Sequence, residues 1–142
     1  MAELPRWIFK SEPSKYSFDD LLREGATVWD GITNALALQN LRKVRRGDGI
    51  FFYYTEGVRE LVGIAEAVCD PYADPKLKDP KRAVVEIRAV RRLPRRIPLK
   101  ELRAEKCFAG SDLLRLGRLS VVPLTADQAE AVLRIAAAGR EA

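Results

Sequence analysis

The segment from Trp29 to Tyr54, WDGITNALALQNLRKVRRGDGIFFYY, carries local signals for one helix, one turn and one strand. Asn34 precedes an apolar-periodic run that extends to Val44, and asparagine is a favourable residue at a helix N-cap. Residues 45–49 include two glycines and an aspartate, which predict a turn because they tolerate positive φ or bond their own backbone. The aromatic run IFFYY that follows is typical of a strand.

Aromatic and amide side chains gather in this segment. A nucleobase offers a flat face that stacks on an aromatic ring and an edge that forms hydrogen bonds. Trp29, Asn34, Tyr53 and Tyr54 therefore suit a site for a flat ring with polar edges. The same aromatic residues also fit an ordinary hydrophobic core, which is their commoner use.

Short strands and short helices alternate along the rest of the chain. The predicted strands are 7–10, 50–54, 61–69, 84–93 and 118–122. Val85, Ile87 and Ala89 alternate with Glu86 and Arg88, as expected for a strand with one face in the core. This pattern favours a mixed α/β (α+β) fold, a small β-barrel with short helices packed around it.

Three further signals mark helix starts and loops. Ser17 with Asp20, and Thr125 with a glutamine at the same spacing, predict a capping box at the start of a helix. The segment 70–82 holds three Asp-Pro pairs and is predicted to be a loop, because proline removes a backbone donor and fixes φ. A proline-flanked turn at 94–98 is expected to follow the strand 84–93.

Length and composition predict a single domain over residues 1–142. The chain is 47% hydrophobic, enough for a core without a disulfide framework. Cys69 and Cys107 are expected to be free thiols in the cytoplasm. No apolar run approaches the ~20 residues of a membrane span, and Met1–Arg6 does not have the layout of a signal peptide.

Charge and the absence of one residue type bear on function. The sequence has no histidine, which removes histidine-based triads, histidine metal sites and the commonest general base. Two separated cysteines do not make a zinc site, and no close acidic pair stands out. We therefore expect no metal, no cofactor and no catalysis. The formal net charge of +5 and the pI near 9.4 suit a polyanionic partner.

Several motifs of this chain occur in the same order in the EVE domain family, which the chain resembles over nearly its whole length. The matches include Lys-Ser-Glu-Pro at 10–13, Tyr-Ser-Phe-Asp-Asp-Leu at 16–21, Trp-Asp-Gly at 29–31 and Arg-Leu-Ser-Val at 118–121. The resemblance implies a PUA-like β-barrel with a pocket tied to nucleic acid. EVE domains are associated with modified bases in DNA. The resemblance therefore implies a non-catalytic module that holds a modified cytosine or adenine of DNA, or of RNA, in an aromatic and polar pocket.

The same resemblance places one group of residues around this pocket: Lys10, Ser11, Glu12, Trp29, Asp30, Asn34, Tyr53, Tyr54, Arg118, Leu119 and Ser120. Trp29 or a tyrosine would supply a stacking face, and Asp30 or Glu12 would accept from an exocyclic amine. Structural roles are equally open for the two acids, because Asp30 can hold its glycine turn and Glu12 can cap a helix. Arg118 can clamp a phosphate or pair with one of them.

Five arginines are predicted to contact the nucleic-acid backbone: Arg88, Arg91, Arg92, Arg95 and Arg96. A strand end that runs into a proline-flanked turn would present several of them together. The alternative is a solvated basic face that binds nothing.

The chain departs from the common EVE pattern near the pocket. Thr33 and Leu38 stand where relatives commonly have arginine, Ala35 where they have tyrosine, and Tyr54 where they have histidine. If Ala35 and Leu38 face the pocket, its wall is predicted to be roomier and more apolar.

Two hypotheses about function follow. The first is a reader of modified nucleic acid that works as a monomer, without a membrane, and is compatible with a nuclease or restriction-type partner. The second is a sensor or enzyme for a small, nucleotide-like molecule on the same barrel. The basic balance and the lack of histidine favour the first. Salt distinguishes them, because only a polyanion releases many counterions when it binds.

Overall fold

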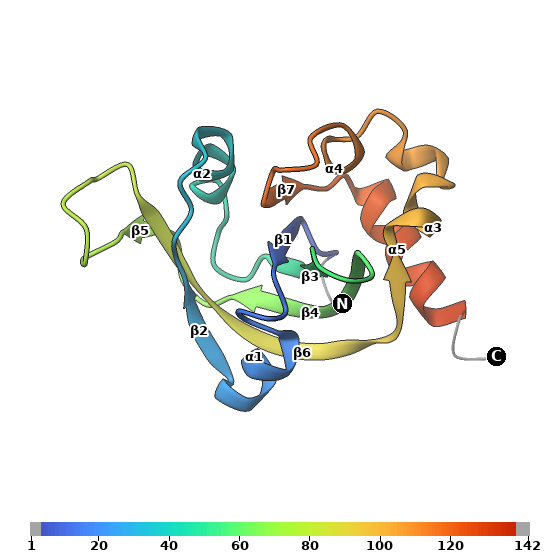
Figure 1. The fold of residues 1–142 in the computed structure, drawn as a ribbon, viewed down its shortest axis with the longest axis horizontal. Helices are drawn as coiled ribbons and strands as arrows, with labels where there is room; N and C mark the ends of the chain where they lie inside the picture. The colour runs from blue at the N-terminus through green and yellow to red at the C-terminus, as the bar shows by residue number, and fades with distance from the viewer. Residues whose placement is uncertain (1–3, 139–142) are drawn as a thin grey trace.

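The computed structural model describes residues 4–138, which form a curled sheet that closes about half of a barrel (Figure 1). Its strands are β1 (Trp7–Ser11), β2 (Ala26–Trp29), β3 (Gly49–Tyr54), β4 (Glu60–Ala67), β5 (Tyr72–Ala73), β6 (Ala83–Pro98) and β7 (Val121–Pro123). The strand order is β2-β6-β4-β3-β1-β7, and β5 pairs separately with β6. β1 and β3 are parallel, whereas the other ladders are antiparallel.

Short helices surround this sheet. They are α1 (Phe18–Glu24), α2 (Ala35–Leu41), α3 (Leu99–Arg103), the 3-10 helix η1 (Lys106–Phe108), α4 (Asp112–Arg115) and α5 (Ala126–Ala138). In Figure 1, α1 lies below the curled sheet, α2 and α4 lie above it, and α3 and α5 lie together near the far end of β6. The predicted fold class, a mixed α/β (α+β) fold built on a small β-barrel with short helices packed around it, is confirmed, and the barrel is about half closed.

The predicted helix starts are confirmed by their caps. Ser17 Oγ accepts from the backbone N–H of Asp20 at 3.0 Å, and the Asp20 carboxylate accepts from the backbone N–H of Ser17 at 2.9 Å. The same reciprocal pair forms at the start of α5. Asn34 Oδ1 accepts from the backbone N–H of Ala37 at 2.9 Å and so caps α2. Each cap satisfies a backbone donor that the first helical turn leaves without a partner.

The strand β6 runs further than predicted. It continues through Pro94 to Pro98, where the sequence predicts a turn, and it curves along the sheet (Figure 1). Its ladder with β4 pairs Ile97 with Leu61 and then Arg92 with Gly63, so Pro94 falls at an irregular step between the two pairs. Such a step tolerates proline because no regular ladder donor is required there.

Other boundaries also differ from the predictions. Ala26–Trp29 forms β2, although no strand is predicted there, because this segment pairs with the distant β6. Helix α2 ends at Leu41, before the predicted Val44, and β4 ends two residues short of the predicted 69. The last strand begins only at Val121, so the residues 118–120 form a turn in front of it.

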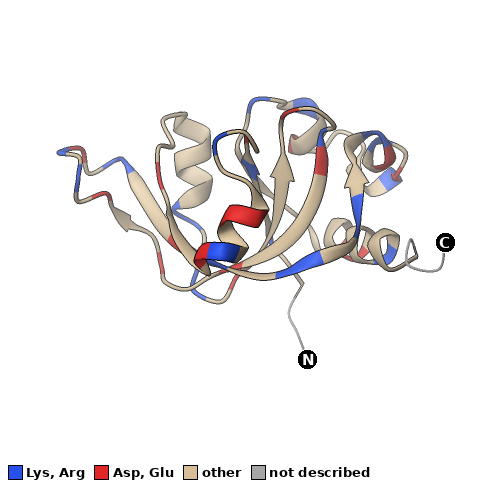
Figure 2. Ribbon diagram, turned by 60° about the horizontal axis from the view of Figure 1, so that its bottom comes forward, with Lys and Arg blue, Asp and Glu red and all other residues tan. Residues whose placement is uncertain are grey.

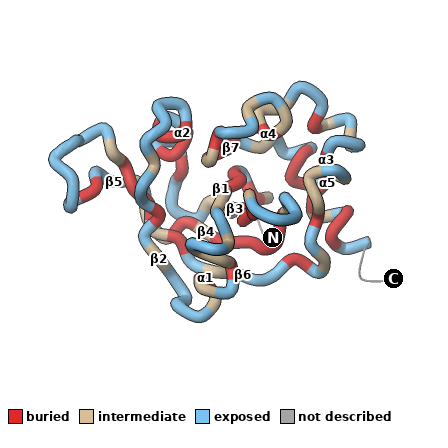
Figure 3. Tube along the Cα trace, viewed as in Figure 1, coloured by how far each residue is buried: buried red, intermediate tan, exposed pale blue. Residues whose placement is uncertain are grey.

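The core is built on aromatic rings from β1, β2, β3 and α1. Phe9, Phe18 and Phe52 are fully buried, and Trp29 is 8% exposed. Figure 3 shows buried positions concentrated on the central strands. Gly63 of β4 lies under the Phe18 ring, where an added Cβ would be 2.5 Å from ring carbons. The close packing of α1 on the sheet therefore requires glycine at this position.

Charged residues are interspersed over the surface. Figure 2 shows basic positions along β6 and on the loop that follows β5, with acidic positions among them. Cys69 and Cys107 are free, as predicted. Among residues 4–138, no helix combines the length and the apolar character that a membrane crossing requires.

Candidate nucleic-acid interface

A cavity of about 590 Å³ lies where the end of β1 meets β2, and we call it the aromatic cavity. It is lined by Ser11, Lys15, Tyr16, Thr27, Val28, Trp29, Asp30 and Lys76. Its volume is typical of small-ligand pockets, which measure about 300–1,000 Å³. Ser11, Trp29 and Asp30, three of the residues expected around a base, therefore border one cavity.

Trp29 is one of the residues that line the aromatic cavity. Its ring centroid lies 5.6 Å from that of Phe9 and 5.5 Å from that of Phe52. Tyr16 meets the indole edge-on at 6.2 Å and is itself only partly buried. Because most of Trp29 is in the core, Tyr16 offers the larger free aromatic surface of the two.

Hydrogen-bond acceptors border this aromatic surface. The Ser11 hydroxyl donates to the carbonyl of Tyr16 at 2.6 Å, which leaves its oxygen free to accept. Asp30 is exposed, and its carboxylate has no hydrogen bond or ion pair with any residue in the range 4–138. Burial, together with a 2.6 Å hydrogen bond to Glu24, raises the pKa of Tyr16 to about 12, so this ring stays neutral. The cavity can thus receive an exocyclic amine on Asp30.

Two lysines stand at the rim of the aromatic cavity. Lys15 is largely exposed and pairs with Glu12 at 3.4 Å. Lys76 is exposed on the loop between β5 and β6, and its backbone N–H donates to the buried Asp74 at 2.9 Å. The lining residues thus include two cations and one acid, which favours an anionic ligand at the rim.

The cationic members of the predicted site lie in a second cavity of about 270 Å³, which we call the basic cavity. It is lined by Lys10, Tyr53, Thr55, Arg59, Leu99, Arg103, Leu113, Leu114, Gly117 and Arg118. Successive residues of a strand point to opposite faces, so Lys10 and Ser11 of β1 reach different cavities. The residues expected to converge on one pocket are therefore divided between two.

Five predicted residues line neither cavity: Glu12, Asn34, Tyr54, Leu119 and Ser120. The Tyr54 hydroxyl accepts from the backbone N–H of Phe18 at 2.8 Å, inside the core. The carbonyl of Ser120 accepts from the backbone N–H of Lys10 at 3.0 Å. These contacts, and the cap that Asn34 provides, support the framework around the cavities.

The departures from the EVE pattern in α2 also lie outside both cavities. Ala35 is exposed, and Leu38 is buried in the core. Neither lines the aromatic or the basic cavity. These two residues therefore do not change the wall of either cavity by direct contact, contrary to the expectation that they would make it roomier.

The five arginines expected on the nucleic-acid backbone all lie on β6, and four of them are in ion pairs. The pairs are Arg88 with Glu66 (3.3 Å), Arg92 with Asp19 (2.5 Å), Arg95 with Glu101, and Arg96 with Glu60 (3.1 Å). Exposed pairs of this kind open at little cost. Each acid nevertheless cancels charge nearby, so the segment offers less net charge than its arginine content indicates.

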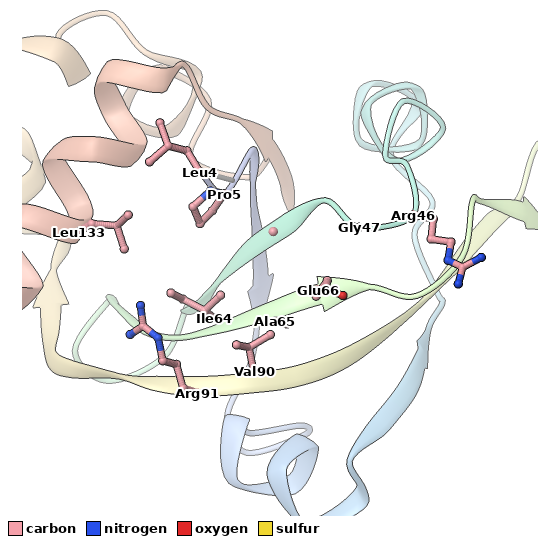
Figure 4. Close-up of a pocket in the computed structure, with 11 residues that line it drawn as sticks. Leu4, Pro5, Arg46, Gly47, Ile64, Ala65, Glu66, Val90, Arg91 and Leu133 are labelled. Atoms are coloured by element: carbon pink, nitrogen blue, oxygen red, sulfur yellow. The ribbon is translucent and has the colours of Figure 1, made fainter. Parts of the chain in front are cut away.

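Arg91, the fifth of them, borders a third cavity of about 490 Å³ (Figure 4). The wall there is mostly apolar and comes from Leu4, Pro5, Ile64, Val90 and Leu133, with Arg46, Glu66 and Arg91 at its edges. No aromatic residue lines this cavity. It therefore has no surface on which a base would stack.

The curled sheet agrees with the comparisons to known proteins. The sequence model of the EVE domain matches residues 5–135, so the chain belongs to the EVE domain family. It is 33% identical to thymocyte nuclear protein 1 of Homo sapiens over an alignment that covers 91% of this chain and 72% of that protein.

Solved structures with the same fold include two informative neighbours. Rpa0253 from Rhodopseudomonas palustris is 34% identical, with a TM-score of 0.87 over 93% of this chain and 92% of that one. The human THYN1 protein in complex with DNA that contains 5-methylcytosine is 29% identical, with a TM-score of 0.79 over 92% and 96%.

Several cavity residues were not predicted from the sequence. Tyr16 belongs to a motif that the chain shares with the family, and this was the available signal for it. Lys76 lies in the Asp-Pro loop, and only the pairing of β5 with β6 brings that loop to the cavity. Arg59 and Arg103 of the basic cavity follow no local pattern that distinguishes them from other surface arginines.

Proposed function

We propose that this EVE domain is a non-catalytic nucleic-acid-binding module that holds a modified base, a methylated cytosine in the first place, in the aromatic cavity. One observation carries the proposal. An aromatic surface formed by Trp29 and Tyr16 and a carboxylate that no described residue neutralises, Asp30, border the same cavity. The THYN1 complex with 5-methylcytosine DNA supports the class of partner.

The face of the base would lie against the Tyr16 ring, and its edge would meet Trp29, because the planes of the two rings are inclined by 74°. Stacking of a base on an aromatic side chain contributes about 1–3 kcal/mol. Trp29 is already fixed by Phe9 and Phe52, so little further ordering is required when a ligand binds. Tyr16 supplies most of the accessible ring surface.

The edge of the base would be read by oxygen acceptors. The N4 amine of cytosine is a donor that aspartate recognises, and Asp30 is free to accept it. Thr27 and Val28 offer apolar atoms to a methyl group, whose burial contributes ~0.8 kcal/mol, or about fourfold in affinity. Methylated adenine also carries an exocyclic amine and is the alternative ligand, in DNA or in RNA.

The expected affinity depends on whether the base is stacked in a duplex or is already accessible in a single strand. A base inside a duplex must leave its stack, at a cost of a few kcal/mol that single-stranded or mismatched bases largely avoid. Lys15 and Lys76 at the rim suit the phosphates on either side of an extruded base. Plain duplex should therefore bind weakly.

We further propose that the domain acts as a monomer in the cytoplasm, and that any cleavage comes from a nuclease or restriction-type partner. Among residues 4–138, a single acid lines the aromatic cavity and none lines the basic cavity, so the described residues bring no pair of carboxylates together in either cavity for acid–base catalysis. The free thiols of Cys69 and Cys107 fit a reducing compartment.

The test is a titration of matched oligonucleotides that carry cytosine, 5-methylcytosine, 5-hydroxymethylcytosine or methylated adenine, each single-stranded and duplex, at one fixed salt concentration. The wild type should prefer methylated cytosine to cytosine by about fourfold to tenfold. Asp30→Asn should weaken binding of the preferred base by about tenfold, because each good base contact is worth about 1–3 kcal/mol.

Asp127→Asn is the matched control, since it makes the same substitution at an exposed acid that lines neither cavity and has no ion pair among the described residues. Equal affinities for all four bases, or equal losses in the two variants, would reject the base-reading proposal. An affinity for nucleotide-like compounds that ignores salt would favour a small-molecule sensor instead.

A further inference from the structure

The basic cavity has a charge composition that binding of a base does not explain. Ten described residues line it, of which none is an acid and four are cations: Lys10, Arg59, Arg103 and Arg118. They come from β1, the turn between β3 and β4, α3 and the turn before β7. Like charges that converge repel each other and disfavour the folded chain. An anion in the cavity would relieve that repulsion.

These four cations differ from many others in the chain because they form no ion pair with a described residue. Ten ion pairs form among the described residues, and none of them includes a cation of the basic cavity. Lys10 is held by neutral groups, because its Nζ donates to the carbonyl of Gly117 at 3.0 Å and lies 5.4 Å from the centre of the Tyr53 ring. The positive charge of the cavity is therefore not cancelled by the residues that line it.

The cavity also offers a neutral donor and an apolar wall. Tyr53 is 2% exposed and its hydroxyl has no hydrogen bond among the described residues. Since no buried side-chain oxygen in that range lacks a partner, this hydroxyl opens on the cavity. Burial raises the pKa of Tyr53, so the hydroxyl keeps its proton and can donate. Leu99, Leu113 and Leu114 lower the local dielectric and so strengthen an interaction with an anion.

We propose that the basic cavity is a second binding site of this domain and that it takes a phosphoryl group on Arg59, Arg103, Arg118 and Lys10. Guanidinium groups offer planar, paired donors that match phosphate oxygens. A volume of about 270 Å³ is below the range typical of pockets for drug-sized ligands and suits a group as small as a phosphate. The phosphoryl group comes from a nucleic-acid backbone or from a free phosphate compound. Only the assignment to a nucleic-acid backbone rests on the proposed function.

The first arm of the test measures the site itself with inorganic pyrophosphate, titrated calorimetrically in chloride buffer of constant ionic strength. Arg59→Gln with Arg103→Gln removes two exposed cations that form no ion pair, and the melting curve of this variant should match that of the wild type. Arg6→Gln with Arg134→Gln is the control, because it removes the same charge from exposed positions outside the cavity.

Pyrophosphate should bind the wild type and the control alike, and the cavity variant at least tenfold more weakly. No binding to the wild type, or equal binding to all three proteins, would overturn the phosphoryl site. The second arm repeats the comparison with a 5-methylcytosine oligonucleotide at several salt concentrations. The cavity variant should flatten the salt dependence by ~0.7–0.9 for each lost phosphate contact.

The two arms separate this proposal from the base-reading function. One outcome is that the wild type binds pyrophosphate more tightly than the cavity variant does, while the two proteins have the same oligonucleotide salt slope. This would support the phosphoryl site, assign it to a free phosphate compound and reject the backbone assignment. A wild type that binds pyrophosphate but does not prefer a modified base would reject the base-reading proposal and still support the phosphoryl site.

Discussion

Lys10 and Ser11 are consecutive residues of β1, yet Lys10 lines the basic cavity and Ser11 lines the aromatic cavity. Strand geometry causes this division, because neighbouring side chains point to opposite faces. β1 is fixed between β3 and β7, where Lys10 pairs with Tyr53 of the parallel strand. A slip of one residue would exchange the two side chains between faces. The register of β1 therefore sets the chemistry of both cavities.

Replacement of Trp29 by alanine should destabilise the fold as well as weaken binding. The indole is packed between Phe9 and Phe52, and truncation of a buried tryptophan costs about 3–5 kcal/mol. Urea unfolding measures this loss. Val28→Ala is the control from the same cavity, since Val28 is 44% exposed and should change stability by less than about 0.5 kcal/mol. A Trp29→Ala protein as stable as the Val28→Ala protein would show that the ring is not part of the core.

Replacement of Gly63 by alanine should cost about 1–3 kcal/mol, because the new Cβ would press into the Phe18 ring at 2.5 Å. Gly117→Ala is the matched control, since an added Cβ there meets no atom within 4 Å. Thermal unfolding of the two variants gives the comparison. Equal melting temperatures would mean that α1 can move away from β4 without loss.

Asn34→Ala should lower stability by about 0.5–2 kcal/mol through the lost cap of α2, and it should leave the affinity for a base unchanged. Asn34→Asp keeps a side-chain acceptor at the cap and should restore most of the stability. Urea unfolding gives the stability, and oligonucleotide titration gives the affinity, of the wild type and the two variants. A loss of affinity in a fully folded alanine variant would show that Asn34 contributes to binding as well as to the helix cap.

The pH dependence of stability should report on the basic cavity. Burial and the charge of Arg59 lower the pKa of Lys10 to about 8, from an ordinary value of 10.5. Between these two values the unfolded chain holds more protons on this residue, so its contribution to stability should rise with pH. The contribution of Lys10 to pyrophosphate affinity, measured as the difference from Lys10→Gln, should fall over the same interval, because the neutral amine no longer attracts an anion.

The other groups that face Lys10 are Tyr53, Arg59, Arg103 and Arg118. Burial raises the pKa of Tyr53. The measurement is the difference in unfolding free energy between the wild type and Lys10→Gln, followed from pH 7 to pH 9.5. A difference that stays constant over this interval would show that Lys10 keeps its ordinary pKa.

The sequence predicted those features that depend on neighbours along the chain. Ser17, Asn34 and Thr125 cap helices through contacts three residues away, and capping depends on this local spacing. The approximate positions of the main strands along the chain follow from apolar patterns in the same way. The family motifs then indicated the class of fold.

The features that depend on distant partners were not predicted. β2 exists because its residues pair with β6, and Pro94 lies within β6 because β4 offers an irregular step. The ion pairs of β6 join Arg92 to Asp19 and Arg96 to Glu60, across many residues of sequence. The division of the expected pocket into two cavities likewise depends on the register of β1 within the sheet.

The binding of a base in the aromatic cavity is tested most directly through the indole N–H signals of the two tryptophans in a proton–nitrogen correlation spectrum. Trp29 lines the aromatic cavity, whereas Trp7 lines neither cavity and donates its indole N–H to Asp48 at 3.0 Å. A Trp7→Phe variant assigns the two signals. Addition of a single-stranded oligonucleotide with 5-methylcytosine should shift the Trp29 signal and leave that of Trp7 in place. With plain cytosine the same shift should require about four to ten times more ligand. Binding that leaves the Trp29 signal unmoved, or that shifts both signals alike, would contradict a base in the aromatic cavity.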